Sequence, residues 1–166
     1  MYIQGKFKET GDDLSDVFYI RRKVFIEEQG VAEDSEFDDY DKSAVFCVVF
    51  EPKTNSNNSE IEELVSVATG RLILLEDGRY KIGRIAVLKE YRGKKYGDMV
   101  VKMLVNRAFL SGANQVYISA QTRVIDFYHK IGFQEYGETY MEDGIEHIAM
   151  VLEKDKMCTS CGNHSN

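Results

Sequence analysis

The first half of the chain begins with a helical pattern of apolar positions. Residues 1–8 alternate weakly between apolar and polar side chains and predict an edge strand. Asp12 or Asp13 can cap the helix that follows, because a carboxylate accepts hydrogen bonds from the free N–H groups of a first helical turn. The predicted helix is amphipathic and carries Leu14, Val17, Phe18, Ile20, Arg21, Val24, Phe25 and Glu28.

Three apolar segments in the middle of the chain predict strands. They are rich in Val, Ile and Leu and cover residues 43–51, 63–76 and 80–88. The first connection, PKTNSNNSE, contains the only proline and predicts a flexible hairpin loop, and the second, DGR, predicts a turn. Consecutive strands with such connections pair antiparallel, so residues 43–88 predict an antiparallel meander.

The second half of the chain changes to helices alternating with strands. Helices are predicted at residues 97–111 and 122–132, the second ending at Gly132, and strands at residues 114–121 and 145–153. A β-α-β unit inside a mixed sheet follows from this order, with helices on both faces. The pattern indicates no internal repeat and no second domain.

Composition and charge restrict the class of protein. With 166 residues and 43% hydrophobic content, the chain can bury roughly 70% of its unfolded surface. We therefore expect one domain over residues 1–154 and a tail over residues 155–166. The formal charge of −7 argues against nucleic-acid binding, which requires a basic face. No run of about 18 apolar residues and no signal-peptide core occur, so we expect a cytoplasmic protein without membrane contact.

The three cysteines do not form a disulfide framework. Cys158 and Cys161 lie in the polar tail at a spacing known from zinc ligands, with His164 nearby. A structural zinc site needs four ligands, and a second pair is missing. We expect no metal requirement, and a metal-dependent interaction module formed by the tail is the alternative.

A basic, glycine-containing turn joins the strand ending near Leu88 to the next helix. Its sequence is RGKKYG, residues 92–97. The first turn of a helix leaves free N–H groups at the positive end of the helix dipole, so a phosphate placed there is bound by several donors. The alternative is a solvated loop. A Walker loop is excluded because Asp98 follows Gly97, and a dinucleotide fingerprint needs three glycines.

With this turn the sequence resembles the GNAT superfamily of acetyl-CoA-dependent N-acetyltransferases, and within it the ElaA-like group. The superfamily pattern is Gln or Arg, two residues, Gly, one residue, then Gly or Ala. Arg92, Lys95 and Gly97 stand at these positions, and Lys95 replaces the usual glycine. The resemblance covers approximately residues 12–152 and is carried in order by RRKVFIEEQG (21–30), EFDDYD (36–41), GRIAVLKEYRG (83–93), SAQ (119–121), FYHKIGF (127–133) and GIEHIAM (144–150).

The resemblance implies an α/β (α+β) fold, the GNAT fold. Its central sheet is mixed and mostly antiparallel, with about six or seven strands and about four flanking helices. A V-shaped splay is implied between the strands at residues 83–88 and 116–121, with the pantetheine arm of the coenzyme in the opening. The resemblance assigns coenzyme binding to Ile85, Ala86, Val87, Arg92, Gly93, Lys94, Lys95, Tyr96, Gly97, Asp98, Gln121, Phe127 and Tyr128.

The implied reaction is direct attack of a neutral amine on the thioester. The Val87 N–H is expected to stabilise the developing oxyanion. Tyr128 matches the position where many members carry a tyrosine beside the coenzyme sulfur and is the candidate general acid, although it can equally pack against the sheet as an ordinary aromatic. Glu28 and His147 are candidate general bases, and catalysis through a water chain without a dedicated base is a further possibility.

The acidic segment EDSEFDDYDK, residues 33–42, predicts a loop or short helix. Its carboxylates can attract a cationic amine by their field, form a solvated surface, cap backbone N–H groups, or pair with Arg21 and Arg22. We expect acetyl-CoA as co-substrate, a small-molecule or protein amine as acceptor, and a possible homodimer. A non-catalytic acyl-CoA sensor of the same fold is the alternative function.

Overall fold

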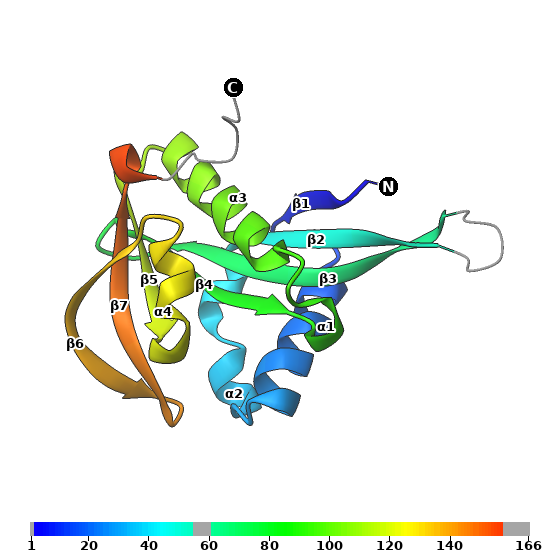
Figure 1. Ribbon diagram of the computed structural model, residues 1–166, viewed down its shortest axis with the longest axis horizontal. Coiled ribbons are helices and arrows are strands. Elements are labelled where there is room, and N and C mark those ends of the chain that lie inside the picture. Colours follow the sequence, from blue (N-terminus) through cyan, green and yellow to red (C-terminus); the bar gives the residue numbers. More distant parts are fainter. Residues whose placement is uncertain (1, 55–60, 158–166) are drawn as a thin grey trace, which may run out of the picture.

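The computed structural model describes residues 2–54 and 61–157 (Figure 1). Within these residues, seven strands form one sheet in the order β1-β2-β3-β4-β5-β7-β6. The strands are β1 (Gln4–Lys8), β2 (Val45–Thr54), β3 (Ile61–Leu74), β4 (Tyr80–Val87), β5 (Gln115–Gln121), β6 (Gln134–Glu142) and β7 (Ile145–Glu153). The helical segments are α1 (Ser15–Arg21), η1 (Arg22–Glu28), α2 (Glu33–Glu36), η2 (Asp39–Lys42), η3 (Lys89–Tyr91), α3 (Tyr96–Leu110), η4 (Thr122–Val124), α4 (Ile125–His129) and η5 (Lys154–Lys156).

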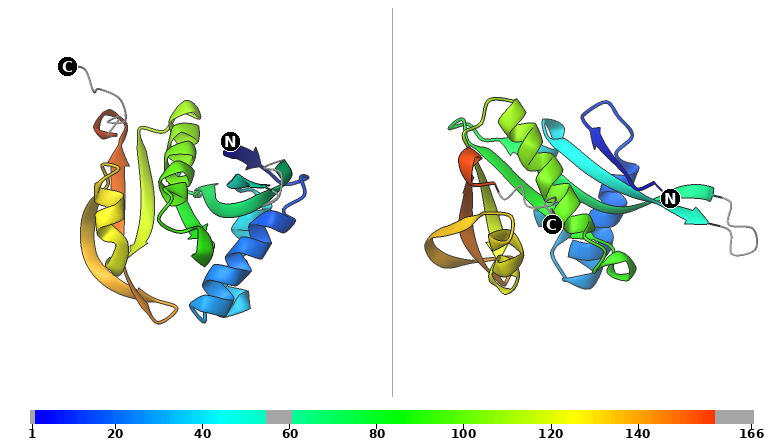
Figure 2. Two further views of the ribbon diagram at one scale, coloured as in Figure 1. Left: turned by 45° about the vertical axis from the view of Figure 1, so that its right-hand side comes forward. Right: turned by 45° about the horizontal axis from the view of Figure 1, so that its top comes forward.

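The sheet opens between β4 and β5. These two strands pair in parallel, and their partners run only from Tyr80 with Val116 to Ile82 with Ile118. Beyond that point the strands diverge, and Figure 2 shows the separation between the half of the sheet that holds β1 to β4 and the half that holds β5 to β7. The mixed, mostly antiparallel sheet with its V-shaped splay is confirmed.

Helices cover both faces of the sheet, as the sequence pattern predicts. α3 lies on one face, where Val100, Val101 and Leu104 are fully buried, and α1 lies on the other, where Val17 and Ile20 are fully buried. Each such side chain contributes about 1.5–3 kcal/mol relative to an exposed one. The two cores fix α1 and α3 on opposite faces of the sheet (Figure 1).

A bulge in β4 bends the strand beside the opening. Thr69 of β3 pairs with Ala86 and Arg71 pairs with Gly83, so Arg84 and Ile85 together oppose Gly70. Arg84 has a φ of 52°, in the left-handed region. One extra residue in a strand bends it and increases its twist, and here it turns the end of β4 away from β5.

Two details differ from the sequence-based expectation. β6 was not predicted, because eight of its nine residues are exposed and show no alternation of buried and exposed side chains. The first helix continues beyond Arg21 as the π-helical segment η1, where a regular helix was expected. Asp13 does accept a hydrogen bond from the N–H of Ser15, the first residue of α1, at 2.9 Å.

Candidate functional site

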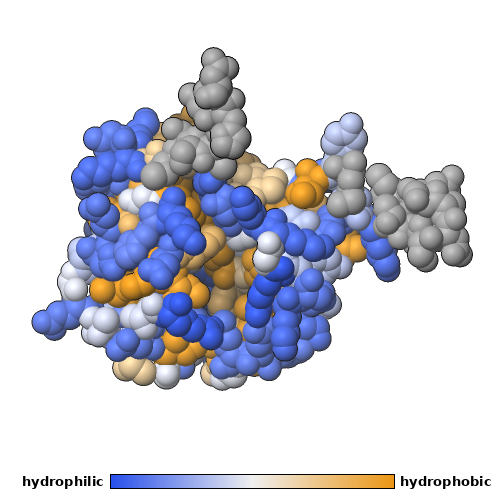
Figure 3. Space-filling view, in the orientation of Figure 1, coloured by the Kyte–Doolittle hydropathy of each residue, from blue (hydrophilic) through white to orange (hydrophobic). Residues whose placement is uncertain are grey.

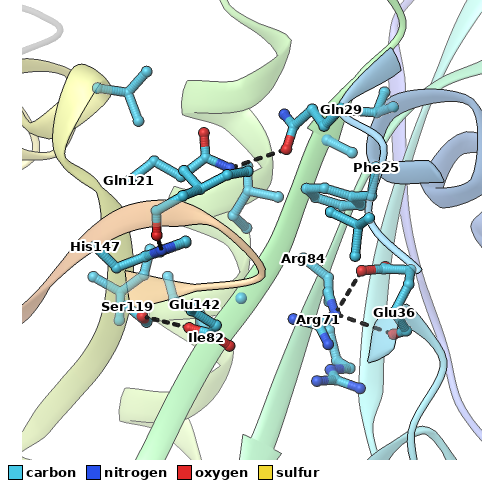
Figure 4. Close-up of a pocket in the computed structure, with 18 of the residues that line it drawn as sticks. Phe25, Gln29, Glu36, Arg71, Ile82, Arg84, Ser119, Gln121, Glu142 and His147 are labelled. Atoms are coloured by element: carbon cyan, nitrogen blue, oxygen red, sulfur yellow. Dashed lines mark hydrogen bonds and ion pairs between the residues drawn. The ribbon is translucent and has the colours of Figure 1, made fainter. Parts of the chain in front are cut away.

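A cavity of about 770 Å³ lies in the opening between β4 and β5. Figure 3 shows hydrophobic residues in the hollow at the middle of this face, with hydrophilic residues around it. Figure 4 shows its two walls, with Ser119, Glu142 and His147 on one and Arg71, Arg84 and Glu36 on the other. The volume is that of a typical small-molecule site.

The end of β4 presents to the cavity backbone groups that do not pair with β3. The Leu88 N–H donates to the Val67 carbonyl of β3 at 3.0 Å. Because backbone groups of successive strand residues point to opposite edges, the N–H and C=O of Val87 point away from β3, toward the opening. Ile85, Ala86 and Val87 all line the cavity, so an extended ligand can lie along this edge like an added strand.

The turn before α3 places backbone close to the cavity. Gly93 has a φ of 80°, and Lys95, which precedes the first residue of α3, has a φ of 64°. Lys95 therefore adopts the left-handed conformation that glycine adopts most easily. Gly97 lines the cavity, where an added Cβ would lie 3.5 Å from Val87 Cγ2 and 3.6 Å from Phe127 Cζ. The first turn of α3 supplies free N–H groups, and Gly97 has no side chain that would keep a ligand away from them. Both features fit a diphosphate.

Arg92 and Lys94 of this turn already have partners. Arg92 binds Glu28 through two hydrogen bonds of 2.7 and 2.8 Å, and its Nε donates to the Val87 carbonyl at 3.1 Å. These bonds from Arg92 hold the pKa of Glu28 below its usual value. Lys94 pairs with Glu51 at 2.9 Å and does not line the cavity.

Two other residues expected to bind the coenzyme face elsewhere. Tyr96 is buried, its hydroxyl donates to Glu51 at 2.5 Å, and burial raises its pKa to about 12. Asp98 pairs with Lys102 one helical turn later at 3.0 Å. Neither residue lines the cavity, so any part they have in binding comes from their backbone or from a rearrangement.

Tyr128 lies at the inner end of the same cavity. The side chain is 7% exposed, and its ring packs edge-to-face against Phe127 and Phe133. Burial raises the pKa of the phenol. Its hydroxyl has no hydrogen-bond partner among the described residues. No buried side-chain oxygen of this part of the chain lacks a partner, so the hydroxyl reaches the cavity that Tyr128 lines.

His147 belongs to a polar group on the β5–β7 side of the opening. Its Nδ1 lies 2.8 Å from the Ile145 carbonyl. A carbonyl only accepts hydrogen bonds, so Nδ1 carries the proton and Nε2 keeps its lone pair in the neutral ring. The ring stacks on Tyr140 with centroids 6.1 Å apart. Ser119 bonds the Tyr140 hydroxyl and donates to Glu142 at 3.3 Å.

A hydrogen bond joins the two walls of the cavity. Gln121 at the end of β5 donates to Gln29, which follows η1, at 3.0 Å (Figure 4). Gln121 was expected at the site, and it lines the cavity together with Phe127. The bond spans the opening from the end of β5 to the segment that follows η1.

Part of the acidic segment is held by arginines, while Glu33, Asp34 and Asp39 are exposed. Arg21 is fully buried and pairs with Glu36 and Asp41 at 2.6 and 2.7 Å. Two further arginines complete an arginine–carboxylate cluster, which consists of Arg21, Arg71, Arg84, Glu36, Asp38 and Asp41. Of the structural alternatives for the stretch FDDYD, residues 37–41, two are present: Asp41 pairs with Arg21, and Asp38 accepts from the Tyr40 N–H. Arg22 pairs with Glu33, which precedes this stretch.

Several cavity residues were not identified from the sequence. Gln29, Lys81, Ser119 and Glu142 line the cavity, but each is a single polar residue that carries no spacing signal. Glu142 was the hardest to find, because it ends β6, the strand that the pattern did not predict.

No group of three or more His, Cys, Asp or Glu side chains in residues 2–54 and 61–157 is arranged to hold a metal ion. Cys158, Cys161 and His164 lie outside the described residues. In the same two ranges, none of the helices has the length and apolar character of a membrane-spanning segment.

Known proteins resemble this chain in sequence and in fold. The family model described as Acetyltransferase (GNAT) domain matches residues 53–154. The uncharacterized protein YyaT of Bacillus subtilis (strain 168) is 34% identical over 150 residues, which are 90% of this chain and 95% of YyaT. The uncharacterized N-acetyltransferase YjcF of the same organism is 31% identical over 143 residues, or 86% of this chain and 94% of YjcF.

Among solved structures, Escherichia coli ElaA superposes with a TM-score of 0.74 and 25% identity, over 92% of this chain and 100% of ElaA. This match agrees with the ElaA-like segments of the sequence. The open sheet, the turn at the start of α3 and these similarities lead to one conclusion: the chain belongs to the GNAT family of acetyltransferases.

Proposed function

We propose that this protein is an acetyl-CoA-dependent N-acetyltransferase that transfers the acetyl group to a primary amine by direct attack on the thioester. The observation that carries the proposal is the Tyr128 hydroxyl, which has no partner among the described residues and lies in the cavity that begins at Gly97. A hydroxyl donor without a protein partner can donate its hydrogen bond to the sulfur of a bound ligand. The raised pKa of Tyr128 keeps the hydroxyl protonated.

The backbone and the turn bind the coenzyme in this proposal. The N–H groups of the first turn of α3 hold the diphosphate, and the exposed edge of β4 at Val87 pairs with the pantetheine arm. Arg92 reaches the diphosphate once it exchanges Glu28 for phosphate oxygens. The Val87 N–H stabilises negative charge on the carbonyl oxygen during attack.

Two side chains that line the cavity, His147 and Tyr128, carry the proton transfers in this proposal. His147 Nε2 accepts a proton from the acceptor ammonium, and the neutral amine then attacks the carbonyl carbon. The new C–N bond forms, and the C–S bond breaks as Tyr128 donates its proton to the sulfur. The proton that the amide nitrogen loses then returns to the Tyr128 phenolate. His147 is preferred to Glu28 as general base, because its Nδ1 is held by the Ile145 carbonyl, which leaves Nε2 to accept the proton.

The test is release of free CoA thiol with a panel of primary amines, alongside the thermal shift that CoA produces. Tyr128→Phe should lower kcat about 100-fold, within the range for one acid–base group, and keep the CoA shift. Tyr19→Phe, at an exposed tyrosine of α1, should change neither. Absence of a CoA shift would refute the proposal. A CoA shift without thiol release from any amine would favour the acyl-CoA sensor.

A further inference from the structure

One lysine in the cavity wall has no role in the chemistry described so far. Lys81 lies in β4 at the closed end of the V, where it still pairs with Tyr117 of β5. The next residue, Ile82, is fully buried in the core under α3. Successive strand residues point to opposite faces, so Lys81 points to the face that α1 covers. There its side chain lines the cavity.

The Lys81 ammonium makes neither a hydrogen bond nor an ion pair with any residue that the structure describes. Such a donor is costly to bury. Burial lowers the pKa of Lys81, an effect that Glu142 opposes and Arg84 and Arg71 increase. No buried side-chain nitrogen of the described residues is left without a partner. The ammonium therefore reaches open space, which at this position is the cavity.

Four arginines also line the cavity. Arg123, which follows β5, donates to Gln121 at 2.8 Å, and the other three are less able to bind an anionic ligand at this end. Arg71 binds Asp38 and Asp41 at 2.5 and 2.7 Å, and Arg84 binds Glu36 at 3.1 Å. Their donors are used in fixing the acidic segment to the sheet. Arg92 lies at the opposite end of β4, beside the turn before α3. The coenzyme phosphates belong to that end, so they do not account for Lys81.

The wall opposite Lys81 offers groups that can accept a hydrogen bond from an ammonium. Glu142 lies close enough to act on the charge of Lys81 but does not pair with it, and His147 presents its Nε2 lone pair. A molecule with an ammonium at one end and an anion at the other matches this arrangement. Lys81 and Ile85 are four residues apart, at most roughly 13 Å along the strand. The bulge at Arg84 and Ile85 shortens this distance, and the lysine side chain covers part of it.

We propose that the acceptor is a small amino acid-like molecule, a primary amine on a short chain that ends in a carboxylate, and that Lys81 binds the carboxylate. This inference rests on the proposed function and names its acceptor class. Lys81 is then a specificity-determining residue. It holds the far end of the acceptor, while the amine lies between His147 and the thioester.

The test compares matched acceptors on the full chain with saturating acetyl-CoA. Glycine, β-alanine and γ-aminobutyrate are each paired with their own carboxamide, which keeps the amine and the length and removes the charge. The variants are Lys81→Met, which keeps the aliphatic chain, and Lys81→Arg, which keeps the cation. Lys156→Met, at an exposed lysine outside the cavity, is the control. Calorimetric titration of the same acceptors into the CoA-bound protein adds a readout without turnover.

In the wild type, at least one carboxylate should exceed its carboxamide in kcat/KM by about tenfold or more, the value of a charge-assisted hydrogen bond. Lys81→Met should abolish this preference, Lys81→Arg should retain most of it, and Lys156→Met should leave it unchanged. Equal kcat/KM for acid and amide in the wild type would overturn the inference. An equal loss on both in Lys81→Met would also overturn it, because Lys81 would then act in proton transfer.

The titrations separate this inference from the proposed function. If no amine releases CoA thiol, the acetyltransferase assignment fails, and binding alone decides the role of Lys81. Carboxylate binding that Lys81→Met abolishes would still support the site. Binding that is equal for acid and amide, or unchanged in Lys81→Met, would refute it.

Discussion

Replacing Gly70 by alanine tests whether the bulge of β4 depends on close packing against β3 and α3. Gly70 lies opposite the extra residue of the bulge. A Cβ at this position would lie 2.6 Å from Ile85 Cδ1, 2.6 Å from Val100 Cγ1 and 2.8 Å from Leu104 Cδ1. Optimal carbon–carbon separations are about 3.5–4.0 Å. Two of these partners belong to α3 and one to β4, so they cannot all retreat in one direction.

The expected cost follows from this overlap. Overpacking a core costs about 1–3 kcal/mol, and loss of glycine freedom in the unfolded chain returns about 0.4–1 kcal/mol. The two ranges together give a net decrease of about 0–2.6 kcal/mol in the free energy of unfolding, and we expect a value in the middle of it, about 1–2 kcal/mol. In a chain of this length each kcal/mol lowers Tm by about 2–4 °C, so Tm should fall by roughly 2–8 °C.

Scanning calorimetry of Gly70→Ala and Gly83→Ala measures this difference. Gly83 lies in β4 across from Arg71, and an added Cβ there meets no atom within 4 Å. Gly83→Ala should therefore keep or slightly raise Tm. Acetyl-CoA affinity should also fall in Gly70→Ala, because Ile85 and α3 must shift beside the opening. Equal Tm values for the two variants would refute the packing argument.

Three further changes test the turn, the candidate base and one surface pair. Glu28→Gln frees Arg92 from an ion pair worth about 0–1 kcal/mol. Calorimetry should therefore show acetyl-CoA binding up to about fivefold tighter, and kcat should not change. A large loss of kcat would make Glu28 the general base. Lys95→Gly should raise Tm by about 2–4 °C by relieving a left-handed lysine, and an unchanged Tm would show no strain. Glu135 raises the pKa of His129, and His129 lowers the pKa of Glu135. The contribution of this pair to stability is complete below the ordinary pKa of histidine and is lost as pH rises through the raised pKa of His129. Glu135→Gln removes the carboxylate that raises this pKa, so NMR should show a lower titration midpoint for His129.

The elements that position the site could be predicted where the chain repeats a hydrophobic pattern. β2, β3, β4 and β5 are visible as apolar segments, and the turn before α3 is visible from its glycines. The splay itself came from the resemblance and not from periodicity. β6 could not be predicted, because a strand exposed along its length leaves no alternation to detect.

The charged contacts of the site could not be predicted for a different reason. Arg92 and Glu28 are 64 positions apart, and Arg71 and Asp38 are 33 apart. Such pairs exist only after the sheet has formed, and a charged residue in a sequence does not reveal its partner. Lys81 shows the same limit, since its lack of a partner became visible only when every neighbour had been placed.

The arginine–carboxylate cluster restricts where substitutions can change the choice of acceptor amine. Removing one member of a buried pair such as Arg21 with Glu36 costs about 3–5 kcal/mol, which is a large share of the stability of an average domain. Substitutions on that wall therefore endanger folding before they alter selectivity. β6, whose residues are exposed except for Glu142, has no buried ion pair among the described residues. Variation in acceptor preference among relatives, and its redesign in the laboratory, should be concentrated around Glu142 and His147.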